Sequence, residues 1–362
     1  MIKFVHTADI HLGLQFNTAS FDKDRAVERR KELWTTFQNI VKYAMDSDVD
    51  FLLVAGDLFE DKYFTLGDMT RVRDILKQAK DVNIIISAGN HDFVNEQSLY
   101  NKVEWSPNVS IFRGESIQRI EFPQLNTVIY GYSWDRVEIR ENTLLDNFPY
   151  EDKDLNRILM IHGDLARESN YLPLNLDTLE KLDMDYIALG HIHKPEKIRE
   201  NIAYCGCPEP LDFGERGSRG FMKGTISDSQ TNVEFVPFSK REFIIKDIII
   251  DEDMGYFDIL DHIKDIDYGE KGKDFFRLNL GGYIQNDLDL KDIISSLKED
   301  FYHLEVIDNT VPDYDLEYLE EAYEENIVGQ FIKEMKSKDL ENPIVKDALY
   351  IGLGALLKGR TG

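Results

Sequence analysis

Short apolar runs that end in polar residues recur along the first half of the chain. Each run has the length of a buried β-strand. The runs are Lys3–Ala8, Leu52–Ala55, Ile84–Ala88, Ile158–Ile161 and Tyr186–Leu189. Between the first three runs, apolar residues recur at helical spacing over Asp22–Asp46 and Leu66–Lys80. This alternation of strands and helices predicts parallel strands in an α/β fold.

From Val109 to about residue 240 the pattern changes to short strands with fewer helices. Strands are expected at Val109–Phe112, Ile117–Phe122, Thr127–Tyr132, Ile202–Cys205, Phe221–Ser227 and Val233–Phe238. Helices are expected at Glu138–Asn147 and Leu174–Leu182. Two layers of strands covered by helices accommodate this order best. We therefore expect residues 1–240 to form an α/β domain, built as a two-layer β-sandwich flanked by helices.

The rest of the chain predicts a small α/β domain over 241–312 and a helical segment over 313–362. The small domain follows the order strand, helix, strand, helix, strand, and Pro312 marks its end. Its elements are expected at Phe243–Ile250, Tyr256–Ile266, Phe275–Leu280, Leu288–Lys298 and Tyr302–Ile307. Amphipathic helices are expected over Tyr314–Met335 and Ile344–Leu357. These two helices either pack back on the body or dock a partner.

Composition narrows the class of protein. The chain has 362 residues, of which 42% are hydrophobic, so it is long enough for a sizeable core and for more than one domain. No apolar run approaches the ~18 residues of a membrane-spanning helix, and the first residues lack the features of a signal peptide. The two cysteines, Cys205 and Cys207, fit packing in a reducing cytoplasm better than a disulfide scaffold.

The formal net charge of −26 argues against nonspecific nucleic-acid binding through the whole surface. It still allows a phosphate substrate that is met by bound cations and a local basic patch. Arg25, Arg29 and Arg30, with Lys31, form the one basic cluster that we select as a candidate DNA contact. The alternative interpretation is the solvated face of an ordinary surface helix.

Candidate metal ligands follow the five apolar runs. Asp9-x-His11 leaves the first strand with both side chains on one side, because residues i and i+2 of a strand point the same way. The carboxyl ends of strands in open α/β sheets are the usual place for ligands. The other runs end in Gly-Asp, Gly-Asn-His-Asp, His-Gly-Asp and Gly-His-x-His. The candidate metal ligands are Asp9, His11, Asp57, Asn90, His162, His191 and His193.

This donor set predicts two ions rather than one. Mixed aspartate, asparagine and histidine ligands favour Mn²⁺, Fe or Zn²⁺ over purely oxygen-bound Mg²⁺. Seven ligands exceed one catalytic ion, whereas two ions that share Asp57 through both of its oxygens fit the number. Two such ions can hold a bridging hydroxide as the nucleophile. His91, backed by Asp92, can then act on the phosphate and protonate the leaving oxygen, so both residues are catalytic candidates.

Taken in order, these motifs resemble those of the calcineurin-like metallophosphoesterase superfamily. Phe4–Gly13 and Ala55–Phe59 resemble the SbcD-type DNA repair exonucleases, including their YhaO-like branch, and so does the segment Tyr204–Gly224. The resemblance covers roughly residues 1–240. It implies the metallophosphoesterase fold with a capping domain that contacts DNA.

The resemblance also implies roles for individual residues. One ion would be held by Asp9, His11, Asp57 and His193. The second ion would be held by Asp57, Asn90, His162 and His191. Archaeal and eukaryotic members often carry histidine three residues after the bridging aspartate, where this chain has Glu60. That departure puts in doubt any activity that depends on the histidine.

The leading functional hypothesis is a DNA exonuclease or endonuclease that uses two Mn²⁺ ions, with Mg²⁺, Fe or Zn²⁺ as alternatives, in double-strand break repair and recombination. The resemblance implies a coiled-coil ATPase of the SbcC type as partner of the C-terminal helices, and it admits a homodimer. One alternative is a small-substrate metallophosphoesterase, such as a cyclic-nucleotide or protein phosphatase. Another is a non-enzymatic scaffold on the same fold.

Overall fold

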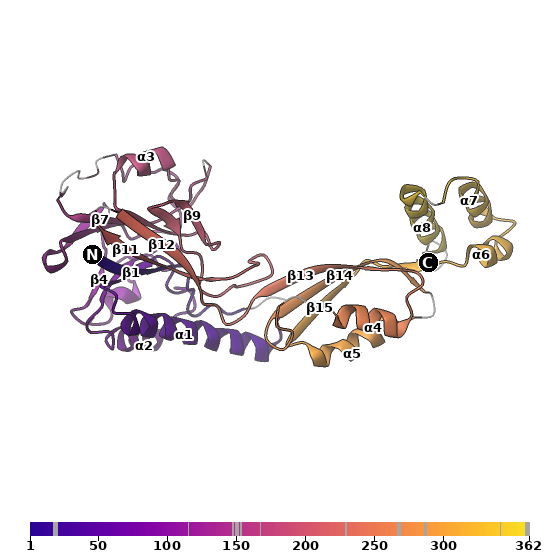
Figure 1. Cartoon of the computed structure of the whole chain (residues 1–362), viewed down its shortest axis with the longest axis horizontal. Helices are drawn as coiled ribbons and strands as arrows, with labels where there is room; N and C mark the ends of the chain where they lie inside the picture. Colours follow the sequence, from indigo (N-terminus) through magenta and orange to yellow (C-terminus); the bar gives the residue numbers. More distant parts are fainter. Residues whose placement is uncertain are drawn as a thin grey trace. The chain divides into compact units, whose positions relative to one another are not determined.

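The computed structural model describes residues 1–16, 21–114, 116–146, 148, 152, 154–166, 168–228, 230–265, 269–285, 288–340 and 342–358. The chain forms two compact units, Met1–Glu242 and Phe243–Gly362 (Figure 1). Among the described residues, no helix is both long and apolar enough to cross a membrane.

Two six-stranded sheets form the first unit. The first sheet has the order β12-β11-β1-β2-β3-β4, in which β1 to β4 are parallel and β11 and β12 are antiparallel additions. Its strands are β1 (Ile2–Thr7), β2 (Phe51–Ala55), β3 (Asn83–Ser87), β4 (Val109–Ile111), β11 (Gly220–Ser227) and β12 (Gln230–Pro237). The predicted parallel pairing of the first three strands is confirmed.

The second sheet has the order β5-β6-β7-β8-β10-β9. Its strands are β5 (Gln118–Phe122), β6 (Thr127–Gly131), β7 (Asn156–His162), β8 (Tyr186–Gly190), β9 (Glu196–Arg199) and β10 (Ile202–Tyr204). Side chains from both sheets, such as Phe4, Phe51, Ile129 and Ile158, share one buried core. The unit is therefore a two-layer sandwich, as the sequence predicts.

Helices cover the outer faces of this sandwich. Figure 1 shows α1 (Lys23–Asp46) and α2 (Leu66–Leu76) along one side and α3 (Leu176–Lys181) on the other. Asp22 caps α1 by accepting the Arg25 N–H, and a capping box of Thr65 and Asp68 starts α2. Short 3₁₀ turns occur at η1 (Leu99–Asn101) and η2 (Pro123–Leu125).

The helix that the sequence predicts over Glu138–Asn147 is wrong for the residues that the structure describes. Residues 138–146 contain turns and an isolated bridge of Ile139 with Tyr171, and Asn147 lies outside the described residues. Leu145 and Phe148 pack into a second core on the outer face of the second sheet. Tertiary burial of single apolar side chains has overridden the helical spacing.

The second unit begins with a four-stranded parallel sheet that α4 and α5 accompany. Its strands are β13 (Phe243–Ile250), β14 (Phe275–Gln285), β15 (His303–Asp308) and β16 (Val311–Asp313). Its helices are α4 (Tyr256–Lys264), α5 (Leu290–Leu297) and the 3₁₀ turn η3 (Lys298–Asp300). Ile259, Ile293 and Leu278 belong to one core that joins the helices to the sheet. The predicted order of elements is confirmed, although Ile266 lies outside the described residues.

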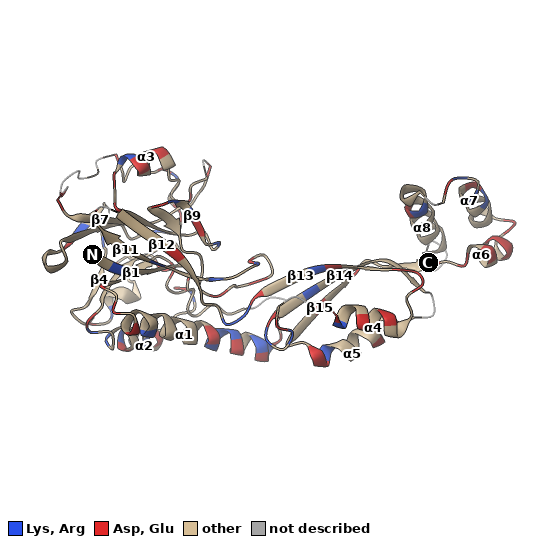
Figure 2. Cartoon of the chain, in the orientation of Figure 1, with Lys and Arg blue, Asp and Glu red and all other residues tan. Residues whose placement is uncertain are grey.

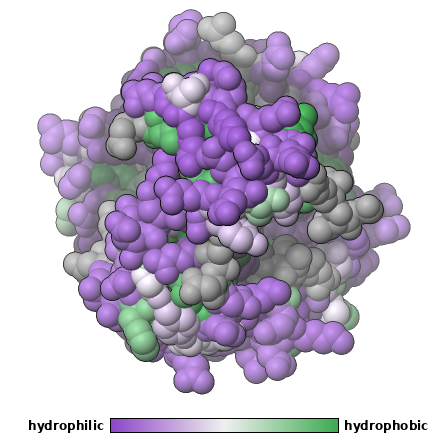
Figure 3. All heavy atoms as spheres, turned by 90° about the vertical axis from the view of Figure 1, so that its right-hand side faces the viewer, coloured by the Kyte–Doolittle hydropathy of each residue, from purple (hydrophilic) through white to green (hydrophobic). Residues whose placement is uncertain are grey.

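Three tail helices follow: α6 (Leu316–Ala322), α7 (Ile327–Lys336) and α8 (Pro343–Lys358). The single helix predicted over Tyr314–Met335 is wrong, because α6 ends at Ala322 and Asn326 caps a new helix, α7. Leu349 and Leu353 are buried in a small core of these helices, with Val328 and Ile332. The view that faces the tail helices is mostly hydrophilic, with separate hydrophobic side chains (Figure 3).

Candidate metal centre

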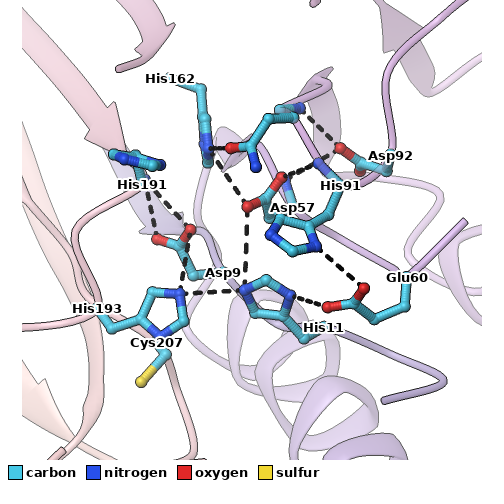
Figure 4. A network of polar contacts seen from close by, with 12 residues as sticks. Asp9, His11, Asp57, Glu60, His91, Asp92, His162, His191, His193 and Cys207 are labelled. Carbon is cyan, nitrogen blue, oxygen red and sulfur yellow. Dashed lines mark hydrogen bonds and ion pairs between the residues drawn. The ribbon is translucent and has the colours of Figure 1, made fainter. Parts of the chain in front are cut away.

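Five strand ends bring the predicted ligands together at one edge of the sandwich (Figure 4). The first sheet supplies Asp9 and His11 after β1, Asp57 after β2 and Asn90 after β3. The second sheet supplies His162 at the end of β7, and His191 and His193 after β8. Because these strands are parallel within each sheet, their carboxyl ends meet at the same edge.

Several of these residues have left-handed backbone conformations. The φ angles of Asp9, His11 and Asp57 are 52°, 51° and 52°, and that of His191 is 99°. Such conformations cost of the order of 1–3 kcal/mol each for residues other than glycine, and they cluster at functional sites. Hydrogen bonds between the loops hold them here, including Asp9 N–H to the Gly56 carbonyl and His11 N–H to the Asp57 carbonyl, both 3.0 Å. The interlocked loops therefore fix the direction of each ligand.

Close approach between the sheets explains two of the glycines at this edge. A Cβ at Gly56 would lie 2.1 Å from Nδ1 of His162, and Gly56 also has a φ of 101°. A Cβ at Gly190 would lie 1.9 Å from the Ala55 carbonyl oxygen. Any side chain at either position would push the two sheets apart at the site.

Four groups of possible metal donors form among the described residues, and two of them consist only of predicted ligands. Asp9, His11 and His193 form the first of these two groups, in which the two histidine Nε2 atoms are 3.1 Å apart. Asp9, Asp57 and His162 form the second group. The remaining two groups are His11, Asp57 and His91, and His193, Cys207 and Glu215. Oδ2 of Asp57 lies 3.3 Å from Nε2 of His162 and 3.9 Å from Nε2 of His11.

Three details concern the sequence-based ligand set. Asn90 joins the second group, because its Oδ1 is 3.1 Å from Nε2 of His162. Oδ1 of Asp57 accepts the backbone N–H of His91 at 2.9 Å, and Oδ2 faces His11 and His162, so the bridging use of both oxygens stays a prediction. The ring of His191 stands beside that of His162, with centroids 5.3 Å apart, and belongs to neither group.

The hydrogen bonds behind the histidines test whether this set fits a metal. Nδ1 of His11 contacts Glu60 at 2.7 Å, Nδ1 of His193 contacts Glu215 at 2.5 Å, and Nδ1 of His162 contacts the Ala55 carbonyl at 2.9 Å. An imidazole that donates from Nδ1 presents the lone pair of Nε2 to the centre. Metal-binding histidines almost always have such an acceptor behind them. The residues therefore fit divalent metal ions.

The electrostatics of the centre favour a cation. Burial lowers the pKa of His162, but the charge of Asp57 and its hydrogen bond raise it to about 9. Burial also lowers the pKa of His193, but Glu215 and Asp9 raise it to about 9. Burial would raise the pKa of Asp57, but the charge and hydrogen bond of His162 lower it. These shifts reflect an excess of negative charge that divalent ions would neutralise.

His91 stands at the exposed side of the centre, and Glu60 supports it. The side chain of His91 is 43% exposed, and its Nδ1 lies 3.0 Å from Oε2 of Glu60. This hydrogen bond raises the pKa of His91 although burial opposes it. Burial would raise the pKa of Glu60, but hydrogen bonds from His11 and His91 lower it to about 2.

The expectation that Asp92 backs His91 is wrong, because Glu60 contacts the His91 ring, whereas a catalytic role of Asp92 stays a prediction. The Asp92 carboxylate is fully buried, where it accepts the backbone N–H groups of Asp57, Leu58 and Gly89 at 3.2, 2.8 and 2.7 Å. It also accepts the hydroxyl of Tyr100 at 2.7 Å. Burial and the charge of Asp57 raise the pKa of Asp92 to about 6. Asp92 therefore ties the loops after β2 and β3 together.

The basic cluster on α1 divides into different environments. One end of α1 carries both acidic and basic residues (Figure 2). Arg29 is fully buried and contacts Glu32, Glu209 at 3.4 Å and the Pro210 carbonyl at 2.7 Å. Its assignment as a DNA contact is wrong, because a buried and ion-paired guanidinium cannot reach a phosphate.

The other two arginines of the cluster keep partial exposure. Arg25 pairs with Glu28, and its side chain is 29% exposed. Arg30 is half-buried and donates to the Gln15 carbonyl at 3.0 Å. Their assignment as DNA contacts stays a prediction.

The sequence reasoning missed the supporting carboxylates. In the sequence Glu60 stands out only as a departure from the family pattern, and Glu215 lies in a glycine-rich segment without periodicity. Glu215 contacts His193 with one oxygen, and with the other it accepts from the Cys207 thiol at 3.3 Å and the Leu211 N–H at 2.8 Å. The position of Glu60, three residues after Asp57, could have indicated a role at the site, because relatives often have histidine there. No sequence feature near Glu215 indicates its contact with His193.

Comparison with known proteins gives one matching family and three similar relatives. Residues 2–195 match the sequence model of the calcineurin-like phosphoesterases. The chain is 27% identical over 246 residues to the uncharacterized metallophosphoesterase YhaO of Bacillus subtilis, covering 65% of this chain and 60% of YhaO. It is 24% identical over 266 residues to the DNA double-strand break repair protein Mre11 of Halobacterium salinarum, covering 70% of this chain and 64% of the relative.

The Mre11 protein of Haloferax volcanii is 23% identical over 275 residues, covering 74% of this chain and 59% of that protein. The chain thus spans about 60% of the length of these relatives.

Proposed function

The chain belongs to the calcineurin-like phosphoesterase family, and on this premise we propose that it is a metal-dependent DNA nuclease. Membership indicates a hydrolase of phosphate esters. The observation that carries the proposal is the pair of donor groups on either side of Asp57, with the exposed His91 beside them. A phosphodiester held at this edge would meet both groups and His91 together.

Two Mn²⁺ ions suit the donor set best, with Fe or Zn²⁺ next and Mg²⁺ least, because nitrogen ligands are as frequent as oxygen ligands. Asp9, His11, Asp57 and His193 would hold one ion. The second would be held by Asp57, Asn90, His162 and His191. When bound, two such ions neutralise phosphate charge and make water nucleophilic near neutral pH.

His91 has the position of a proton donor to the leaving oxygen. Glu60 accepts at Nδ1, so Nε2 is the nitrogen that remains for a substrate. The raised pKa of His91 favours its protonated form at neutral pH, in which Nε2 donates. The partial exposure of the ring allows contact with a large substrate outside the buried ligands.

Support for DNA as the substrate comes from the relatives and from the second unit. Two of the relatives are DNA double-strand break repair proteins. The second unit has its own cores and adds a domain that hydrolysis of a small substrate does not need. Contact with DNA would be local, through groups such as Arg25 and Arg30, because the chain as a whole is acidic.

The test compares two substrates with and without Mn²⁺. A nuclease degrades end-labelled linear duplex DNA and also hydrolyses bis(p-nitrophenyl) phosphate, and both activities disappear with a chelator. Hydrolysis of the small ester without any cleavage of duplex or single-stranded DNA would favour a small-substrate phosphoesterase. Loss of neither activity in Asp57→Ala protein would contradict the proposed centre.

The partner of this nuclease is proposed to be a coiled-coil ATPase of the SbcC type, which would bind the tail. Ile344 and Ile351 are 78% and 69% exposed and lie seven residues apart on α8, so they share one face of the helix. Leu349 and Leu353 of the same helix are buried within the tail, so they are not available for docking.

Co-purification of such an ATPase should be lost in Ile344→Asp and Ile351→Asp proteins. It should survive Ile249→Asp, where the isoleucine is 68% exposed on β13. Equal binding by all three proteins would contradict this docking face. Light scattering of the same proteins would reveal whether α8 instead serves a homodimer.

A further inference from the structure

We propose that Glu60 is a positioning residue that fixes both the metal ligand His11 and the proton donor His91. Its carboxylate lies between the two rings, with Oε1 2.7 Å from Nδ1 of His11 and Oε2 3.0 Å from Nδ1 of His91 (Figure 4). The ring centroids are 4.9 Å apart, and the rings are nearly perpendicular. The inference rests on the proposed metal-dependent hydrolysis and assigns a role within it.

The backbone around Glu60 is held on both sides. Its N–H donates to the Leu12 carbonyl at 2.9 Å, and its carbonyl accepts from Tyr63 at 2.9 Å and Phe64 at 3.0 Å. The N–H of Asp61 donates to the carbonyl of His91 at 3.1 Å. The loop after β2 is therefore tied to the loops that carry both histidines, and the carboxylate cannot drift from the space between the rings.

The chemistry of a carboxylate fixes the state of both rings. An ionised carboxylate only accepts hydrogen bonds, so both imidazoles must carry hydrogen at Nδ1. For His11 this leaves the lone pair of Nε2 toward the donor groups around Asp57. For His91 it leaves Nε2 as the atom that meets substrate. One side chain thus sets the orientation of a ligand and of a catalytic group.

Glu215 provides a matched comparison within the same centre. It supports His193 in the way that Glu60 supports His11, but its other contacts are Cys207 and the Leu211 N–H rather than a second histidine. The side chains of Glu60 and Glu215 are similarly buried, at 12% and 17% exposed. Replacing Glu215 should therefore affect metal binding alone, whereas replacing Glu60 should also affect the action of His91.

Glutamine separates the two contacts of Glu60. An amide of the same length has one oxygen that accepts and one NH₂ group that donates. Its oxygen can accept the Nδ1–H of only one ring, and its NH₂ group cannot accept that of the other. Because neither ring then keeps a charged acceptor at Nδ1, Glu60→Gln should weaken both metal binding and the action of His91, while the side-chain volume stays almost unchanged.

The experiment is a double-mutant cycle on purified full-length protein. Glu60→Gln and Glu215→Gln are each made alone and with His91→Ala. Calorimetry measures Mn²⁺ binding, and cleavage of end-labelled duplex DNA, whose alkoxide leaving group needs a proton, gives kcat and KM at saturating Mn²⁺. Thermal melting verifies that each variant is folded. Both glutamine variants should bind Mn²⁺ about 10- to 100-fold more weakly, the usual effect of removing a group behind a ligand.

The cycle with His91 distinguishes positioning from a general loss of metal. Glu60→Gln should lower kcat about 10-fold or more with His91 present, and by less than about twofold in the His91→Ala protein. Glu215→Gln should lower kcat by the same factor in both backgrounds. Equal effects of Glu60→Gln in both backgrounds would overturn the link to His91, and unchanged Mn²⁺ binding would overturn the link to His11.

Failure of the proposed function gives a different pattern. Wild-type protein that binds Mn²⁺ and cleaves no DNA would refute the proposed function. The positioning role is then decided by Mn²⁺ binding and by the ¹⁵N shifts of the His11 and His91 rings, which report the ring tautomers. Rings that keep hydrogen at Nδ1 in Glu60→Gln protein would overturn it.

Discussion

Replacement of Arg29 by alanine is expected to destabilise the first unit strongly. Arg29 is fully buried, and its guanidinium lies between two carboxylates, those of Glu32 and Glu209. Removal of one partner from a buried ion pair typically costs about 3–5 kcal/mol, because the remaining charge loses its compensation. We expect a loss of this size in the free energy of unfolding at pH 7.

The contacts show where the cost arises. Glu32 would keep Arg241 at 2.7 Å and Lys240 at 2.8 Å, so its charge stays compensated. Glu209 would keep the Thr36 hydroxyl and the Lys240 N–H, both at 2.7 Å, but it would lose the guanidinium. Hydrogen bonds to charged groups contribute about 1.5–3 kcal/mol each, and Arg29 also donates to the Pro210 carbonyl. The two lost contacts with Glu209 and Pro210 account for the expected range.

The pH dependence of the loss has a definite sign. Burial raises the pKa of Glu209, and the charge of Arg29 counteracts this. Without Arg29 the pKa of Glu209 rises further. A carboxyl with a raised pKa in the folded protein costs stability at high pH and regains it as it protonates. The difference between Arg29→Ala and wild type should therefore be smaller at pH 5 than at pH 7.

Urea unfolding followed by tryptophan fluorescence measures this loss. All three tryptophans, Trp34, Trp105 and Trp134, belong to the first unit, so the signal reports on that unit. Arg25→Ala, one turn earlier on α1, is the control and should cost less than about 1 kcal/mol, because its pair is partly exposed. A loss below about 1 kcal/mol in Arg29→Ala, or a loss that grows toward pH 5, would refute the reasoning.

Three further predictions concern the centre and its substrate. Asp57→Ala protein should lose both metal ions and all hydrolysis, because Oδ2 of Asp57 faces both His11 and His162. Elemental analysis that still finds two tightly bound ions would contradict this prediction. His91→Ala should keep its metal and DNA binding but lose at least ~10²-fold in cleavage rate, as expected for a general acid; full activity or loss of metal would refute the assignment. Arg30→Ala should lower the salt slope of DNA binding by about one unit, and an unchanged slope would return Arg30 to a structural role.

The strand ends were predictable because their signals are local. Side chains alternate along a strand, and α/β sheets bind ligands at the carboxyl ends of their strands. These two rules predict from the sequence alone that Asp9, Asp57 and His162 lie together. The burial of Arg29 could also have been predicted from its position in the helix. It lies three residues after Ala26 and four before Leu33, on the inward stripe of α1.

Other features depend on contacts between distant segments. Glu215 reaches His193 from a loop 22 residues later, and nothing in its own neighbourhood indicates this. The role of Asp92 is set by backbone N–H groups of the preceding loop, which sequence patterns do not place. The break of the tail between Ala322 and Asn326 follows from the cap that Asn326 gives α7, which competes with an otherwise continuous apolar stripe.

If the proposed ions bind, the division of their ligands between the two sheets would make metal supply a determinant of folding. Asp9, His11, Asp57 and Asn90 come from the first sheet, and His162, His191 and His193 come from the second. Ions bound here would link the two sheets of the folded protein, and the unfolded chain would have no such link. By mass action, free metal at 100 times its dissociation constant would stabilise the folded protein by about 2.7 kcal/mol for each independent site. A cell that is short of metal would then hold less of this protein in folded form, so abundance as well as activity would follow metal availability.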